Sequence, residues 1–92
     1  MGAARFFEWD EDKATLNARK HGVLFPVATR VFADQLGFEL LIDHPRRDEE
    51  RWNFLGLVDG RLLVVTYTMR GKVTRIISAR FATARERRGY HG

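Results

Sequence analysis

The fold of this chain is decided by the stretch Arg51-Trp-Asn-Phe-Leu-Gly-Leu-Val-Asp-Gly-Arg-Leu-Leu-Val-Val-Thr-Tyr-Thr68. The residues before the Asp-Gly pair alternate, which places Trp52, Phe54 and Val58 on one side and Arg51, Asn53, Leu55 and Leu57 on the other. Asp59-Gly60 is a dipeptide typical of a tight hairpin turn. The apolar run that follows predicts a central strand covered on both faces. We therefore expect an antiparallel hairpin of strands 51–58 and 61–68.

Two more strands extend this hairpin. Arg70-Gly71 predicts a second tight turn, after which Lys72 to Phe81 forms the last strand, and 38–42 forms a strand before an exposed loop over 43–50. Strands joined by tight turns are antiparallel. In the last strand we expect strict alternation, with one face made by Val73, Arg75, Ile77, Ala79 and Phe81 and the other by Thr74, Ile76, Ser78 and Arg80.

The rest of the chain is predicted to be mainly helical, after a brief strand over 6–9. A first helix begins after the N-cap Asp10 and ends at Gly22, with Asn17 and His21 at the boundary between core and solvent. A second short helix begins at Pro26 and ends near Asp34. The capping box Thr83-x-x-Glu86 opens a terminal helix, which gives Glu86 a structural role.

These elements predict one α+β domain over residues 1–92, in which the helices lie on an antiparallel sheet. The sheet is a four-stranded meander accompanied by the short N-terminal strand. Two helices precede the meander and a short helix follows it.

Positive charge gathers at the C-terminal end of the chain. The whole chain has 16 Lys and Arg against 12 Asp and Glu, but residues 1–60 carry a balance of −3 and residues 61–92 a balance of +7. Such a positive pole concentrates polyanions around it, so nucleic acid is the leading class of partner. A solvated basic face that only maintains solubility is the alternative.

Several kinds of site are excluded or disfavoured. The chain has no Cys, and therefore no disulfide, thiolate zinc site or cysteine nucleophile. We expect a cytoplasmic protein without a membrane partner, since no apolar run reaches the length of a membrane span. No phosphate-binding glycine loop is present, and the spacing of His21, His44 and His91 with Asp43 matches no zinc pattern. We therefore expect neither a metal nor another cofactor.

The remaining residues suit RNA cleavage, which needs no cofactor when the 2′-hydroxyl of the RNA is the nucleophile. Arginine forks can hold the phosphate, and His21, Glu50 and Tyr90 are possible proton carriers, with Lys20 able to lower the pKa of a neighbour. Candidate RNA-binding cations are Arg51, Arg70, Lys72, Arg75, Arg80, Arg85, Arg87 and Arg88.

Each candidate also has a structural explanation. Arg51 could pair with Glu49 or Glu50, and Arg80 with an acid on the first helix. Tyr90 could pack the terminal helix against the sheet. The arginines of that helix could form a solvated face.

Two segments carry a resemblance to a known family. They are Phe7-x-Trp-Asp-x-x-Lys13-x-x-x-Asn17-x-x-Lys20-His-Gly-Val-x-Phe25 and Arg75-Ile-Ile-Ser-Ala-Arg80-x-Ala-Thr-x-Arg-Glu-Arg87-x-x-Tyr90. Together with Glu50-Arg51-Trp52 and Gly56, they resemble the BrnT family of bacterial toxins.

The resemblance implies a RelE-like fold and a ribonuclease that inhibits translation. It also implies a cognate antitoxin with a ribbon-helix-helix-type DNA-binding domain, which neutralises the toxin and represses the operon, so that operator DNA is reached only through the antitoxin. By motif position, the site residues would be Lys20, His21, Glu50, Arg51, Arg80 and Tyr90.

The resulting hypothesis is a metal-independent endoribonuclease in which Arg51 and Arg80 hold the scissile phosphate while His21 or Glu50 handles protons. One alternative is a non-catalytic module that binds nucleic acid or a protein partner through the same basic surface. Another is a degenerate toxin that acts only as a corepressor with its antitoxin.

Overall fold

The structure, a computed structural model, describes residues 5–42 and 48–92. It contains a five-stranded sheet in the order β1-β5-β4-β3-β2, with helices before and after the strands. In chain order the elements are β1 (Phe6–Glu8), α1 (Glu11–His21), α2 (Phe25–Ala28), the 3-10 helix η1 (Thr29–Ala33), β2 (Phe38–Ile42), β3 (Arg51–Val58), β4 (Arg61–Arg70), β5 (Val73–Phe81) and α3 (Ala84–His91).

The sheet is mixed. Strands β2 to β5 are antiparallel neighbours in sequence order, whereas β1 pairs in parallel with β5. The predicted α+β class is confirmed, but the meander is not a separate sheet, because β1 extends its β5 edge. That pairing covers only the start of β5, from Val73 to Arg75, and among the described residues no strand pairs with the rest of this edge.

The central hairpin forms as predicted. Asp59 and Gly60 both have positive φ, 51° and 80°, which suits the right-handed twist of the two strands that they join. On β3, Phe54 packs with the core under the first helices, whereas Leu55 packs with Leu62 and Val64 on the opposite face. The predicted alternation of β3 is therefore confirmed.

The predicted alternation of β5 is wrong after Ile76. Thr66 of β4 is opposite Ser78, but the next residue, Tyr67, is opposite Ile76, so Ile77 is an extra residue in β5. Such a bulge shifts the phase of the side chains by one residue. As a result, Ile76 and Ala79 lie in the same core instead of on opposite faces.

Helix α1 covers the part of the β5 edge that β1 does not reach. Asn17 is buried, contrary to its predicted boundary position. Its side-chain amide makes the hydrogen bonds to β5 that a neighbouring strand would otherwise make. Its side-chain nitrogen donates to the carbonyl oxygens of Ala79 and Val23 at 2.9 and 3.0 Å, while its oxygen accepts from the Ala79 amide at 3.0 Å. The predicted caps of α1, Asp10 and the left-handed Gly22, are confirmed.

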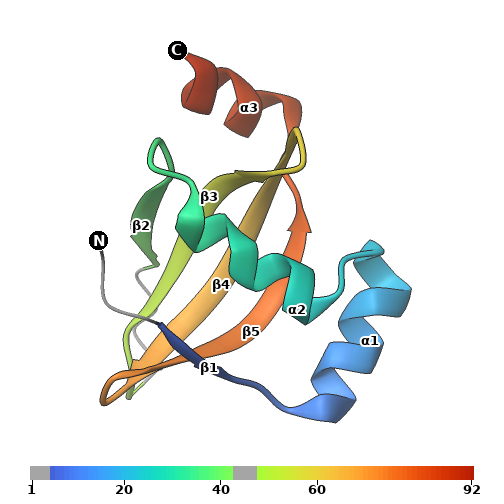
Figure 1. The fold of residues 1–92 in the computed structure, drawn as a ribbon, viewed down its shortest axis with the longest axis vertical. Coiled ribbons are helices and arrows are strands. Elements are labelled where there is room, and N and C mark those ends of the chain that lie inside the picture. Colours follow the sequence, from blue (N-terminus) through green and yellow to red (C-terminus); the bar gives the residue numbers. More distant parts are fainter. Residues whose placement is uncertain (1–4, 43–47) are drawn as a thin grey trace.

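The second predicted helix is divided in two. Residues 25–28 form α2, but from Thr29 the chain continues as the 3-10 helix η1. The Thr29 hydroxyl donates to the Pro26 carbonyl three residues earlier, which competes with regular α-helical bonding. The tighter turn places Phe25, Ala28 and Val31 in the core between these helices and the sheet, and α2 crosses in front of the sheet in Figure 1.

The sheet therefore has two different sides. We call the side under α1, α2 and η1 the helix-covered face, and the other side the open face. Helix α3 lies at one end of the molecule (Figure 1), where Tyr90 packs on the open-face cluster of Leu55, Leu62, Val64 and Ala82. In the described part of the chain, no helix is long and apolar enough to cross a membrane.

Helix α3 is fixed by polar contacts at both ends. The predicted capping box of Thr83 and Glu86 is present. The same Glu86 carboxylate accepts two hydrogen bonds from Arg80 of β5, at 2.7 and 3.0 Å, so the partner of Arg80 is not the predicted acid of the first helix. At the other end, the Tyr90 hydroxyl donates to Asp34 at 2.5 Å.

We expect Asn17→Ala to lower the free energy of unfolding by roughly 2–3 kcal/mol, because it leaves the Ala79 amide and carbonyl buried without partners. Urea unfolding measures this change. Thr15→Ala on the exposed side of α1 is the control and should change stability by less than about 0.5 kcal/mol. Equal stability of the two variants would show that the amide does not complete the sheet.

A second prediction concerns acid stability. The hydrogen bonds from Arg80 lower the pKa of Glu86 to about 2, so this contribution to stability is full above the pKa of the unfolded state and is lost as pH falls towards 2. Glu86→Gln should therefore cost roughly 1 kcal/mol at pH 7 and progressively less below pH 4.5. A stability difference that does not change between pH 7 and pH 2.5 would contradict this coupling.

Candidate nucleic-acid interface

The candidate site is the open face of the sheet beyond the end that α3 covers. Strand register arranges its side chains in two rows across the strands. One row includes Arg51 beside Ile42, and Thr68 beside Arg75. The next row contains Leu40, Asn53, Thr66 and Ser78. Cations in the first row therefore border an uncharged polar row.

The polar row offers several hydrogen-bonding groups. The Thr66 hydroxyl donates to the Asn53 side-chain oxygen at 2.6 Å, which orients the Asn53 amide group. Ser78, the opposite residue on β5, is half-buried. Neutral groups of this kind can form hydrogen bonds with ribose hydroxyls and phosphate oxygens, and they do not repel the negative charge of a phosphate.

Arg51 is the least engaged of the three arginines on this face. Its only described ion pair is a long one, with Nη2 at 3.4 Å from Glu49, so the predicted structural partner is present. Its Nε is buried and has no hydrogen-bond partner among the described residues. Because this Nε is buried, the Nη groups are the donors that Arg51 presents to a phosphate.

The other two arginines are held more firmly. Arg75 pairs with Glu8 of β1 at 2.6 Å, and Arg80 makes its two bonds to Glu86. Those bonds raise the pKa of Arg80, which stays charged. The two acids orient the guanidiniums, and a phosphate would have to share or displace these contacts.

Lys20 and His21 lie at the border of the open face. Both line a shallow cavity of about 200 Å³ between α1 and β5, together with Ser78 and the bulge residue Ile77. The Asn17 contact fixes the rotation of α1 and thereby directs its last turn towards Ser78. The structure thus brings Lys20 and His21 to the polar row.

Glu50 lies on the other side of this face. Its carbonyl oxygen accepts from the Thr68 hydroxyl at 2.6 Å, which places it at the start of β3. Strand β4 separates β3 from β5, so Glu50 and His21 are at least about two strand spacings, roughly 10 Å, apart. The two predicted proton carriers are therefore not brought together.

Tyr90 is placed away from both groups. Its ring packs on the core under α3 and stacks with Phe38 at 6.4 Å between centroids, and its hydroxyl contacts Asp34. The hydrogen bond to Asp34 raises the pKa of Tyr90 to about 12 and, with the Leu57 amide, lowers the pKa of Asp34. These contacts support the structural explanation, in which Tyr90 packs the terminal helix.

The remaining predicted RNA-binding cations lie around this face. Arg70 and Lys72 are exposed at the turn between β4 and β5. The cations of α3 are also exposed, namely Arg85, Arg87 and Arg88. Within residues 5–42 and 48–92, no group of three or more His, Asp or Glu side chains is arranged to hold a metal, and His44 and Asp43 lie outside these ranges.

Sequence reasoning missed the polar row. Asn53 and Thr66 could have been found, because the Asp59-Gly60 turn fixes their pairing opposite each other. Ser78 could not, because the bulge at Ile77 changes the face on which it would be counted. Taken together, the face presents arginines next to neutral hydrogen-bonding groups, with a histidine and a lysine at its border.

Comparison with known proteins identifies the family of this chain. A search of curated proteins finds no match to the chain. A family model described as the ribonuclease toxin BrnT of type II toxin–antitoxin systems matches residues 9–86, a range that includes α1, the whole of β2 to β5 and the start of α3. The chain therefore belongs to the BrnT family of ribonuclease toxins.

Proposed function

We propose that this protein is a metal-independent endoribonuclease that inhibits translation in the cytoplasm and is neutralised by a cognate antitoxin. The observation that carries the proposal is the open face, where three arginines border a neutral polar row and a histidine and a lysine lie at its edge. The family description supports ribonuclease activity. The α+β architecture with one uncovered sheet face supports the RelE-like fold that the resemblance implies.

In the proposed reaction, the 2′-oxygen of the RNA attacks the adjacent phosphorus while the bond to the 5′-oxygen breaks. His21 takes the proton from the 2′-hydroxyl, and the departing 5′-oxygen gains a proton from water or from Lys20. Arg80, on the same strand as Ser78, stabilises the charge on the scissile phosphate, whereas Arg51, two strands away on β3, binds a neighbouring phosphate of the RNA. The products are a 2′,3′-cyclic phosphate and a free 5′-hydroxyl.

The antitoxin is the second proposed partner. An acidic or apolar segment of it would cover the open face and exclude RNA, and its ribbon-helix-helix domain would bind the operator. Exposed apolar side chains at the border of this face, including Phe38 and Leu40, offer contacts that RNA does not need.

We predict that the purified toxin, freed of antitoxin, cleaves total RNA in excess EDTA, that Arg80→Ala slows cleavage by at least about 100-fold, and that Arg51→Ala slows it by roughly tenfold through weaker RNA binding. Gel analysis of the products measures this rate. Two controls separate chemistry from stability. Glu86→Gln breaks the same ion pair as Arg80→Ala but keeps the guanidinium, and Arg30→Ala removes a surface pair with Asp59 away from the open face. Both controls should retain cleavage.

Undiminished cleavage by the Arg80→Ala and Arg51→Ala proteins would refute the assignment of the site. RNA that stays intact with the parent protein, in EDTA and also with translating ribosomes, would refute the ribonuclease. Operator binding by the complex alone would then identify a corepressor, and RNA binding that weakens steeply with salt would identify a binding module.

Separate substitutions test the proton carrier. Because His21 lies beside Ser78 whereas Glu50 lies beyond β4, we expect His21→Gln to slow cleavage by about 100-fold or more and Glu50→Gln to have little effect. His91→Gln on α3 is the matched control. A normal rate for His21→Gln together with a large loss for Glu50→Gln would transfer the proton-carrying role to Glu50.

A further inference from the structure

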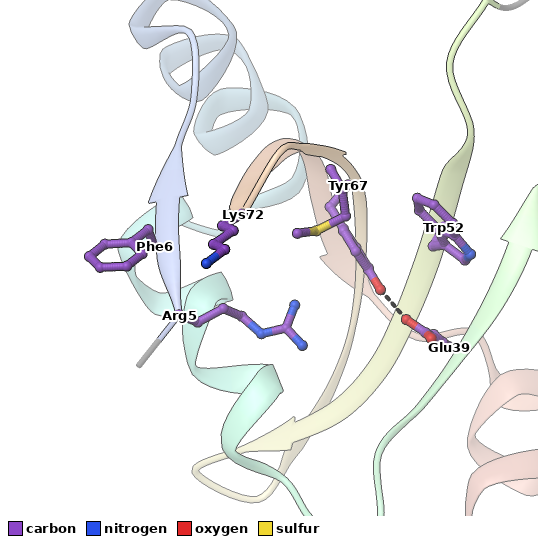
Figure 2. Close-up of a pocket in the computed structure, with 7 residues that line it drawn as sticks. Arg5, Phe6, Glu39, Trp52, Tyr67 and Lys72 are labelled. Carbon is purple, nitrogen blue, oxygen red and sulfur yellow. Dashed lines mark hydrogen bonds between the residues drawn. The ribbon is translucent and has the colours of Figure 1, made fainter. Parts of the chain in front are cut away.

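A second cavity, of about 690 Å³, opens on the helix-covered face, at the end of the sheet where β4 turns into β5. Figure 2 shows its side chains, which come from the segment before β1 and from β1, β2, β3, β4 and the β4–β5 turn. The lining residues are Arg5, Phe6, Glu39, Trp52, Tyr67, Met69 and Lys72.

An aromatic pair forms one wall of this cleft. The rings of Trp52 and Tyr67 are nearly parallel, with centroids 5.8 Å apart and planes inclined by 25°. Tyr67 is held from behind by an edge contact with Phe32, while Trp52 is only half-buried. Trp52, which stacks on the fixed Tyr67 ring, therefore offers a flat apolar surface. Little conformational entropy is lost when a ligand binds to it, because the ring is already ordered.

The cleft also has separated charges. Arg5 lies over the Phe32 ring at 4.3 Å and donates to Thr74 at 3.3 Å, and neither Arg5 nor Lys72 makes an ion pair within the described residues. In Figure 2 both cations lie on one side of Tyr67, opposite Trp52. The Glu39 carboxylate accepts a hydrogen bond from the Tyr67 hydroxyl and lies below Trp52 in Figure 2.

Positively charged side chains near the β4–β5 turn lie between the open face and the cleft. Arg75 of the open face lies three residues after Lys72, and Arg70, opposite Val73 at the end of β4, lies on the same face as Arg75. Cations therefore follow the sheet from the open face around the β4–β5 turn to the cleft. A single strand of RNA leaving the open face at this end would reach the cleft after passing Arg70.

We propose that the cleft binds one nucleotide of single-stranded RNA outside the cleavage site, with its base against Trp52, its exocyclic amino group on Glu39 and its phosphate at Arg5 and Lys72. Aromatic stacking next to a cationic groove is the usual chemistry of single-strand binding. A carboxylate is a hydrogen-bond acceptor and not a donor. It therefore favours adenine, cytosine or guanine, which have an exocyclic amino group, over uracil, which has none. The inference rests on the proposed RNA substrate but not on cleavage.

The test measures the fluorescence of Trp52 itself, so neither residue of the aromatic pair has to be replaced. Trp9→Phe leaves Trp52 as the only tryptophan, and short 2′-O-methyl oligonucleotides lack the nucleophilic hydroxyl and are not cleaved. We expect oligoadenylate to quench Trp52 fluorescence, and an abasic strand of the same length to bind roughly tenfold more weakly with little quenching. Oligouridylate should bind more weakly than oligoadenylate.

Substitution of Lys72 locates the binding site. Lys72→Ala should weaken oligoadenylate binding by about fivefold, whereas Arg19→Ala, which removes an exposed cation of α1, should leave it unchanged. Anisotropy of a labelled oligonucleotide reports binding anywhere on the protein. Two results would overturn the cleft proposal: anisotropy that shows binding while Trp52 fluorescence is not quenched, or equal quenching by the abasic strand. Neither result would bear on the ribonuclease proposal.

Two further outcomes separate the proposals. Quenching by antitoxin but by no oligonucleotide would make the cleft a protein interface and overturn its assignment to RNA. Normal quenching by a protein that fails to cleave RNA would support the cleft and overturn only the enzymatic proposal.

Discussion

The structure depends on a strand edge that no strand completes. Strand β1 pairs with only three residues of β5, so the backbone at Ala79 would be buried without partners. Asn17 supplies both a donor and an acceptor at this point. These bonds hold helix α1 against the β5 edge, and the last turn of the helix, which carries Lys20 and His21, lies beside Ser78.

The two faces of the sheet have separate tasks. The helix-covered face holds most of the apolar core, in which Phe25 and Val31 pack against Val65 and Tyr67. The open face has its own small core only where α3 covers it, and beyond α3 it is polar and basic. The bulge at Ile77 serves both faces, because it changes the phase of the β5 side chains. Ile76 and Ala79 therefore both lie in the core, while Ser78 and Arg80 lie on the open face.

Local sequence patterns predicted those parts of the fold that depend on short-range chemistry. The Asp59-Gly60 turn, the caps of α1 and the box at Thr83 are determined by residues within a few positions of each other. The bulge, the burial of Asn17 and the pairing of Arg80 with Glu86 were not predicted, because each depends on a tertiary neighbour. For the candidate site, residue types predicted Arg51 and His21, but only the sheet register shows that Asn53, Thr66 and Ser78 lie together.

If RNA lies across the open face, as we propose, the arginine side chains there will report it directly. The measurement is the NMR signal of each Nε–H group, recorded with and without a 2′-O-methyl RNA oligonucleotide. We expect the signals of Arg51, Arg75 and Arg80 to shift on binding while those of Arg30 and Arg61 do not. Shifts confined to the arginines of α3, with Arg51 and Arg80 unchanged, would contradict it.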